Sequence, residues 1–181
     1  MRGQNPEKNQ ELLKQVQLKL GKFVSLVEEN HGMVVAHTQP DKLLSAMKEL
    51  KENPLFNFDV LIDLTSVDYL GKRDVRFEMV YMLLSSKTLS RIRIKAPVAE
   101  NEEVPSLIDI WKGANWPERE VFDLMGIRFS KHPLMERLIM PDGYIGHPLR
   151  KDFPVKGRGE DYLIESILRP VKKEAGAQES L

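Results

Sequence analysis

The sequence predicts an α+β protein: a mixed or antiparallel sheet with helices on one face, followed by an extended C-terminal arm. Three observations lead to this prediction. A short apolar run precedes a segment with helical spacing, three strand-like segments follow in succession, and the last part of the chain is rich in glycine and proline. A strand and helix followed by consecutive strands favour a sheet that is covered on one face. The length of 181 residues fits one globular domain and a tail.

The N-terminal part of the chain contains two helical patterns around one short strand. Apolar residues recur at helical spacing in residues 7–29, which predicts one or two helices with an interruption at Gly21. The apolar run Met33–Ala36 predicts a strand. After Pro40, a helix is predicted whose apolar face consists of Leu43, Leu44, Met47 and Leu50.

Three consecutive segments carry the alternating pattern of strands. In the first, one buried face is expected to be formed by Phe58, Val60, Ile62 and Leu64. Turn-forming residues at Gly71–Asp74 connect it to Arg76–Leu84, so the pair is predicted to be a hairpin. The third segment, Leu89–Ala96, should turn Ile92 and Ile94 inward and its basic residues outward.

Two short helices are predicted in the next part of the chain. The first is indicated by Pro105 in its first turn and by the apolar spacing of Val104, Leu107, Ile108 and Trp111. The second is Trp116–Met125. Asn115 is predicted as its N-cap, Glu118 as the residue that reaches back, and Gly126 as the left-handed residue that ends it.

The last part of the chain has a different composition. Residues 141–181 hold five glycines and four prolines and a single short apolar cluster, Tyr162–Leu168, so they cannot form a core. We therefore divide the chain into an α+β domain, residues 1–140, and an extended arm, residues 141–181. Composition leaves two alternatives open for the arm, a flexible tail or a segment that becomes ordered on a partner protein.

Composition also excludes several classes of function. Basic and acidic residues balance at 27 each, so no overall charge favours nucleic acid. Without cysteine the chain has no disulfides, no thiolate zinc site and none of the usual ligands of iron–sulfur clusters. No apolar run approaches the roughly 20 residues that span a bilayer, and no signal-peptide core is present, so we expect the chain in the cytosol.

Motifs that carry chemistry are few. The sequence has no nucleotide-binding glycine loop and no nucleophile elbow, and its histidines lack the spacing of a helical metal site; they are His31, His37, His132 and His147. A stand-alone enzyme that uses His132 or His147 with nearby carboxylates stays open, as does a free-standing binding module. The charged residues Glu118 to Glu120 with Asp123 fit acid–base carboxylates, a solvated helix face or bonds across a subunit interface.

Several segments between Asp63 and Pro154 form a long and specific pattern. They are Asp63-Leu-Thr-Ser-Val-Asp-Tyr69, Arg76-Phe-Glu-Met-Val-Tyr81, Asn115-Trp-Pro-Glu-Arg-Glu-Val-Phe-Asp-Leu-Met-Gly-Ile-Arg-Phe129, His132-Pro133 and Gly146-His-Pro-Leu-Arg-Lys-Asp-Phe-Pro154. This pattern resembles the 30-kDa subunit of respiratory complex I, NADH-quinone oxidoreductase. It is also similar to the equivalent subunits of membrane-bound nickel–iron hydrogenases and sulfur-reducing complexes, so these alternatives stay open.

The resemblance implies a non-catalytic structural subunit in the peripheral arm of a membrane-bound, ion-translocating oxidoreductase that passes electrons from NADH or ferredoxin to quinone. It implies docking on the hydrogenase-like large subunit and contact with the small iron–sulfur subunit, with the ferredoxin-like subunit as a further candidate. The chain itself would bind no cofactor, and iron–sulfur clusters or a nickel–iron centre would belong to its partners. It would lie on the cytoplasmic side of the cell membrane, attached through those partners, and bind no nucleic acid.

The predicted functional residues lie on the signature helix and in the arm. No catalytic, cofactor-binding or metal-binding residue is assigned, and the partner interface is assigned to Trp116, Glu118, Arg119, Glu120, Asp123, His147, Arg150, Lys151 and Asp152. Truncating one member of a charge pair buried at an interface costs roughly 2–5 kcal/mol, against almost nothing on a solvated face.

Overall fold

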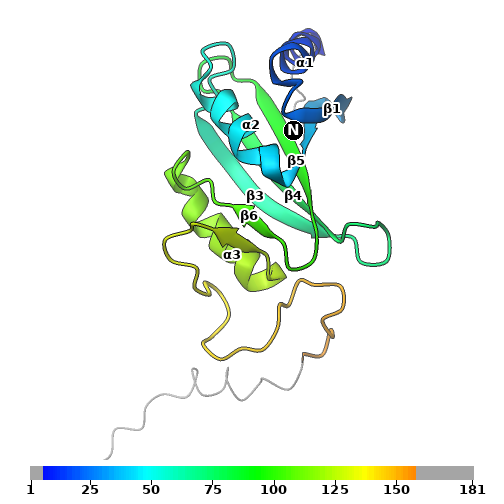
Figure 1. Ribbon diagram of the computed structural model, residues 1–181, viewed down its shortest axis with the longest axis vertical. Coiled ribbons are helices and arrows are strands. Elements are labelled where there is room, and N and C mark those ends of the chain that lie inside the picture. Colours follow the sequence, from blue (N-terminus) through cyan, green and yellow to red (C-terminus); the bar gives the residue numbers. More distant parts are fainter. Residues whose placement is uncertain (1–5, 158–181) are drawn as a thin grey trace, which may run out of the picture.

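The computed structural model describes residues 6–157, and a five-stranded sheet lies at the centre of this part of the chain (Figure 1). The strand order is β1-β2-β5-β4-β3, and a separate two-stranded sheet joins β6 and β7. The helices cover one face of the large sheet. These features confirm the predicted α+β class with a mixed sheet.

The five strands of the large sheet are β1 (Val24–Asn30), β2 (Met33–Thr38), β3 (Val60–Asp68), β4 (Phe77–Leu84) and β5 (Arg91–Val98). β2 pairs parallel with β5, while β1–β2, β3–β4 and β4–β5 are antiparallel. The predicted hairpin is thus confirmed, and β4 and β5 lie in the interior of the sheet because each has a strand on both sides.

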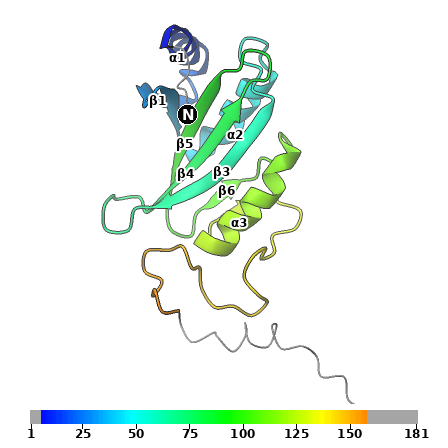
Figure 2. The same ribbon diagram turned by 180° about the vertical axis from the view of Figure 1, so that it is seen from behind.

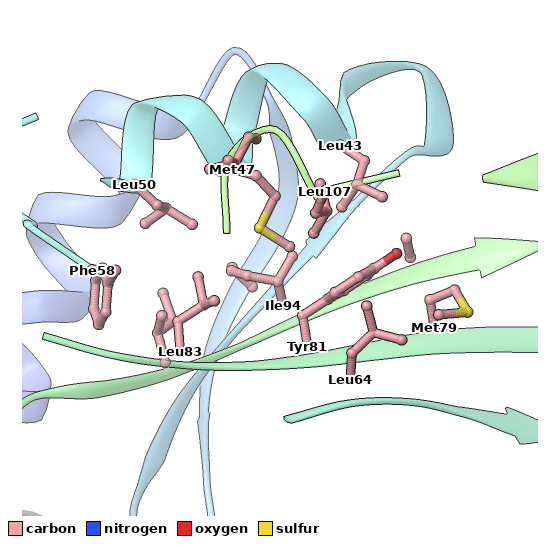
Figure 3. Packing of buried hydrophobic residues seen from close by; sticks show 14 of the residues in the cluster. Leu43, Met47, Leu50, Phe58, Leu64, Met79, Tyr81, Leu83, Ile94 and Leu107 are labelled. Atoms are coloured by element: carbon pink, nitrogen blue, oxygen red, sulfur yellow. The ribbon is translucent and has the colours of Figure 1, made fainter. Parts of the chain in front are cut away.

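The helices are α1 (Pro6–Leu20), α2 (Pro40–Glu52) and α3 (Asn115–Met125). α2 begins at Pro40, whose missing N–H costs nothing in the first turn of a helix. Figure 3 shows side chains of α2 directed at those of β4 and β5; labelled among them are Leu43, Met47, Leu50, Tyr81, Leu83 and Ile94. These residues are fully buried, so the core lies between the sheet and its helices.

The second N-terminal helix that the spacing allowed is wrong, because Val24–Asn30 forms the edge strand β1. A bulge between Val24 and Leu26 shifts the register of β1 against β2. As a result Val24 and Val27 both contact the core, although they are three residues apart. The bulge therefore reproduces the spacing of a helix within a strand.

The predicted buried face of β3 is wrong in part for the same physical reason. A register shift between Leu61 and Asp63 places an extra residue in β3. Val60 and Ile62 are consequently 38% and 45% exposed, while Leu64 is buried. The alternation from Val60 to Leu64 does not describe one face.

The first of the two predicted short helices is also wrong. Glu103–Pro105 is a strand, β6, which pairs parallel with β7 (Arg128–Ser130). The apolar spacing comes from one turn after β6, in which the N–H of Trp111 donates to the carbonyl of Leu107 at 2.8 Å. A short 3-10 helix (Lys112–Ala114) then leads into α3.

Candidate docking site

Residues 131–157, which we call the C-terminal segment, contain no helix or strand and yet lie against α3 and the β3–β4 hairpin. The backbone N–H of Leu149 donates to the carbonyl of Leu124 at 3.0 Å. Arg150 Nε donates to the carbonyl of Met125 at 2.7 Å. The carbonyl groups at the C-terminal end of α3, which have no acceptor role within the helix, therefore receive their hydrogen bonds from this segment.

Asp123 is the main anchor of the segment on α3. Its side chain is fully buried, and Oδ2 accepts the backbone N–H groups of Leu138, Ile139 and Met140 at 3.0, 2.7 and 2.8 Å. Oδ1 accepts Arg137 Nη1 at 2.6 Å. Burial acts to raise the pKa of Asp123, but these hydrogen bonds outweigh it and lower the pKa, so the carboxylate is charged.

Two arginines fix the path of the segment by donating to backbone carbonyl groups. Arg137 Nη2 donates to the carbonyls of Tyr144 and Gly146 at 2.9 and 3.1 Å. Arg119, on α3, donates to the carbonyls of Glu136 and Arg137 at 3.1 and 3.0 Å. The guanidinium fork suits such paired acceptors, so the loop is held without secondary structure.

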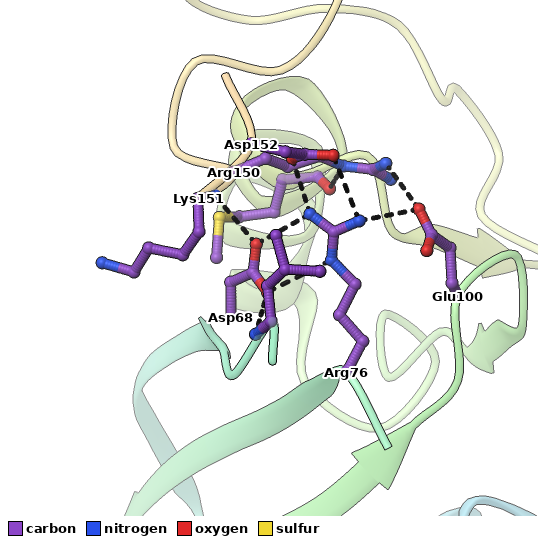
Figure 4. A network of polar contacts seen from close by, with 8 residues as sticks. Asp68, Arg76, Glu100, Arg150, Lys151 and Asp152 are labelled. Carbon is purple, nitrogen blue, oxygen red and sulfur yellow. Dashed lines mark hydrogen bonds and ion pairs between the residues drawn. The ribbon is translucent and has the colours of Figure 1, made fainter. Parts of the chain in front are cut away.

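A second anchor lies around Arg76 at the start of β4 (Figure 4). Its guanidinium contacts Asp68 of β3 at 3.0 Å, Glu100 at 2.9 Å and Asp152 of the C-terminal segment at 2.6 Å. The N–H of Lys151 also donates to Asp68 Oδ2 at 2.9 Å. Hydrogen bonding to Asp68 raises the pKa of Arg76, so the arginine stays charged.

Gly126 permits a close approach between α3 and the segment. It ends α3 with φ 75°, as predicted, and a Cβ there would lie 2.5 Å from His147 Cδ2 and 2.6 Å from Arg150 Nη2. His147 Nδ1 lies 2.8 Å from the carbonyl oxygen of Asp123, which assigns the proton to Nδ1. Burial lowers the pKa of His147, so its ring is neutral.

Glu118 is buried on the other side of α3. It accepts the hydroxyl of Ser106 at 2.6 Å and the N–H of Leu107 at 2.7 Å. The predicted capping box is therefore wrong, because Ala114 occupies the N-cap position without a side-chain bond and Glu118 turns inward. A solvated helix face is also wrong for Glu118 and Asp123, which are both fully buried.

The environment of Glu118 predicts a pH dependence of stability. Burial raises its pKa to about 6 from the ordinary 4.5, against the lowering effect of Ser106 and Leu107. The folded state therefore binds the proton of Glu118 more tightly than the unfolded state does. The stabilisation that this proton gives the folded state is complete below pH 4.5 and is lost as the pH rises through 6. Relative to Glu118→Gln, we expect the wild-type free energy of unfolding to fall by about 2 kcal/mol from acid to neutral pH. Urea unfolding of both proteins across this range measures it, and parallel pH profiles would contradict it.

The structure brings most of the predicted interface residues together around α3. Glu118 and Asp123 are fully buried, and Arg119, His147 and Arg150 are half-buried with partners in the same chain. The exposed residues are Trp116, Glu120, Lys151 and Asp152. Contact with a partner stays a prediction for all of them.

Part of the predicted arm packs on the α+β domain. Residues 141–157 lie on α3 and the β3–β4 hairpin, whereas the cluster Tyr162–Leu168 lies outside the described residues. The roles of Asp68, Arg76 and Arg137 were not predicted. For Asp68 a signal existed, since it continues the inward positions of Leu64 and Ser66 in β3 with a charged side chain.

The exposed surface of this assembly carries several large apolar side chains among charged ones. Exposed apolar side chains extend from the start of α3 along the C-terminal segment; they are Trp116, Leu134, Ile139, Ile145, Leu149 and Val155. Within residues 6–157, no group of histidine and carboxylate side chains could hold a metal ion. In the same range, no helix is long and apolar enough to cross a membrane.

The sequence is similar to a known protein family and to several of its members. The family described as respiratory-chain NADH dehydrogenase, 30 Kd subunit, matches residues 36–159. The C subunit of NADH-quinone oxidoreductase from Rhodopseudomonas palustris is 44% identical over 145 residues, 78% of this chain and 71% of the relative. Its counterpart from Trichlorobacter lovleyi is also 44% identical over 145 residues, 78% of this chain and 88% of the relative.

Two solved structures share the fold. A trypsin-resistant fragment of Nqo5 has a TM-score of 0.57 at 29% identity, covering 69% of this chain and 97% of the fragment. A chain of the membrane-bound sulfane sulfur reductase, an archaeal respiratory membrane complex, has a TM-score of 0.70 at 22% identity, covering 96% and 99%. The family match spans more than half of the sequence and includes α3 and the whole C-terminal segment. The chain therefore belongs to the family of the 30-kDa subunit of respiratory-chain NADH dehydrogenase.

Proposed function

We propose that the chain is a non-catalytic structural subunit in the peripheral arm of a membrane-bound, ion-translocating, complex I-like oxidoreductase. Its C-terminal segment would dock on the hydrogenase-like large subunit. The protein would act by position, keeping its neighbours rigid so that their iron–sulfur clusters stay within electron-transfer distance. It would pass no electron itself.

One observation carries this proposal: the buried charged residues of the signature hold the C-terminal segment in place while its apolar side chains remain outside. Asp123 and Arg76 are engaged in bonds within the chain. Ile145 and Leu149 are 62% and 57% exposed on the resulting surface. A rigid segment with outward apolar side chains loses little entropy on binding, which favours a docking role.

The relatives support the choice of complex and its location. Their names and the solved neighbour's title place such subunits in NADH-quinone oxidoreductase and in a respiratory membrane complex. We infer that the small iron–sulfur subunit and the ferredoxin-like subunit are further neighbours. Membrane association would arise on the cytoplasmic side, through these partners.

The histidines favour the scaffold over the stand-alone enzyme. His147 is neutral, half-buried and bonded to the carbonyl of Asp123 beneath Gly126. His132 accepts the N–H of Leu134 through Nδ1 at 3.1 Å, and its Nε2 lies 3.4 Å from the carbonyl of Asn115. Both rings are used to shape turns of the C-terminal segment.

The docking role is tested by placing charges on the exposed apolar surface. In cells that make the complex, we expect the double variant Ile145→Lys, Leu149→Lys to reduce recovery of the large subunit with the tagged chain about tenfold or more. The fold should be unchanged because both side chains face water. Leu18→Lys on α1, at an 80% exposed position, is the control. Equal recovery with the double variant and the control would contradict docking through this surface.

A further inference from the structure

The face of β3 and β4 that points away from the helices carries exposed apolar side chains. We call it the outer face, and Figure 2 shows the sheet from that side, with α2 behind the strands. Val60, Ile62 and Val67 of β3 are 38%, 45% and 36% exposed. On the neighbouring strand, Met82 and Leu84 are half-buried and face the same way, since Leu84 is opposite Val60.

This composition is unusual for an open sheet face. Strands that face water on one side alternate apolar inward with polar outward. β5 follows that rule, because Ile92 and Ile94 face inward while Arg91 and Arg93 face outward. β3 and β4 break it in part: Val60, Val67, Met82 and Leu84 face outward, and the bulge near Ile62 adds a further apolar side chain, although the polar Asp63 and Thr65 lie between Ile62 and Val67 on this face.

Arg93 borders the apolar patch directly, because it is paired with Met82 in the sheet register. Its Nε is buried and has no acceptor among the described residues. Two other cations nearby, Lys95 and Arg73, already have a carboxylate partner in Glu78. Lys95 Nζ lies 3.1 Å from Glu78 Oε2, and Arg73 Nη1 lies 2.8 Å from Glu78 Oε1. A buried donor without an acceptor is costly, and a guanidinium is best satisfied by a carboxylate.

We propose that the outer face docks a second protein subunit, which places apolar side chains over Ile62, Val67 and Met82 and a carboxylate against Arg93. The proposal rests on the chain's proposed place in a multi-subunit complex and concerns a different surface from the C-terminal segment. A second copy of this chain fits less well. It would have to bring two copies of Arg93 and of the other outward basic residues of β5 toward each other, with the exposed Asp63 as the carboxylate.

Site-specific photo-crosslinking in the intact complex tests this assignment. A benzoylphenylalanine probe replaces Ile62 in the full-length chain, and a matched probe replaces Leu18, which is exposed on α1. We expect the probe at 62 to capture another subunit at a stretch with apolar residues and a carboxylate, and the probe at 18 to capture none. Arg93→Glu should lower the cross-linking yield of the probe at position 62 about tenfold, because the new carboxylate would face the carboxylate of the partner.

A third probe, at Ile145, separates this proposal from the proposed function. Cross-links at 145 together with none at 62 would overturn the outer-face proposal alone. Cross-links from 62 to a second copy, or to this chain's own residues 158–181, would also overturn it. Cross-links from 62 to another subunit, with none from 145, would support the outer face and count against docking through the C-terminal segment.

Discussion

Replacement of Arg76 by methionine should lower the free energy of unfolding by about 3–5 kcal/mol, the cost of leaving a buried carboxylate without its cation. The side chain of Asp68 is fully buried against Arg76, which is itself 9% exposed. The same guanidinium bonds Asp152, so its loss also releases the end of the C-terminal segment. Methionine keeps much of the volume of the arginine stem, so the change reports mainly on charge.

Urea unfolding of the purified chain measures this effect. Arg73→Met is a matched control, because Arg73 also pairs with a buried carboxylate, that of Glu78, but its own side chain is 48% exposed. We expect the control to change stability by less than about 1 kcal/mol. Similar small effects of the two substitutions would show that the Arg76 cluster does not hold the segment.

Replacement of Asp123 by alanine should have a comparable effect, concentrated in the C-terminal segment. It removes the acceptor of three backbone N–H groups and of Arg137 at once. A loss of about 3 kcal/mol in local stability corresponds to about a 100-fold faster hydrogen exchange. The amides of Leu138, Ile139 and Met140 are the ones that should accelerate.

Hydrogen exchange read by mass spectrometry on the wild type and variants provides the comparison. Glu120→Ala, an exposed carboxylate on the same helix, should leave exchange in the segment unchanged. Asp123→Asn should fall between the two, because it keeps an acceptor oxygen and loses the charge. If the alanine variant showed wild-type protection at residues 138–140, the anchoring role of Asp123 would be wrong.

The elements that could be predicted from the sequence are those whose periodicity is undisturbed. α2 and β5 are of this kind, since the helix spacing of the one and the strand alternation of the other agree with the structure. The errors have local physical causes. Bulges in β1 and β3 change which side chains share a face, and β6 depends on pairing with β7, which is distant in sequence.

The site could be predicted as a set of residues and not as an arrangement. Glu118 lies on the same buried stripe of α3 as Val121 and Met125, at helical spacing, so an inward-facing carboxylate could have been inferred. The bonds of Asp123 to residues 138–140 could not, because the partners are backbone groups of an irregular segment. Arg76 and Asp152 are likewise joined only by the tertiary fold.

The most direct test of the structural-subunit proposal is mass spectrometry of the proteins recovered with the tagged wild-type chain from gently solubilised membranes. We predict stoichiometric recovery of a hydrogenase-like large subunit together with a small iron–sulfur subunit. A large subunit without nickel ligands would indicate a complex of the NADH-quinone oxidoreductase or sulfur-reducing type, and one with them a hydrogenase. Recovery of the chain alone, from the soluble fraction, would contradict the proposal.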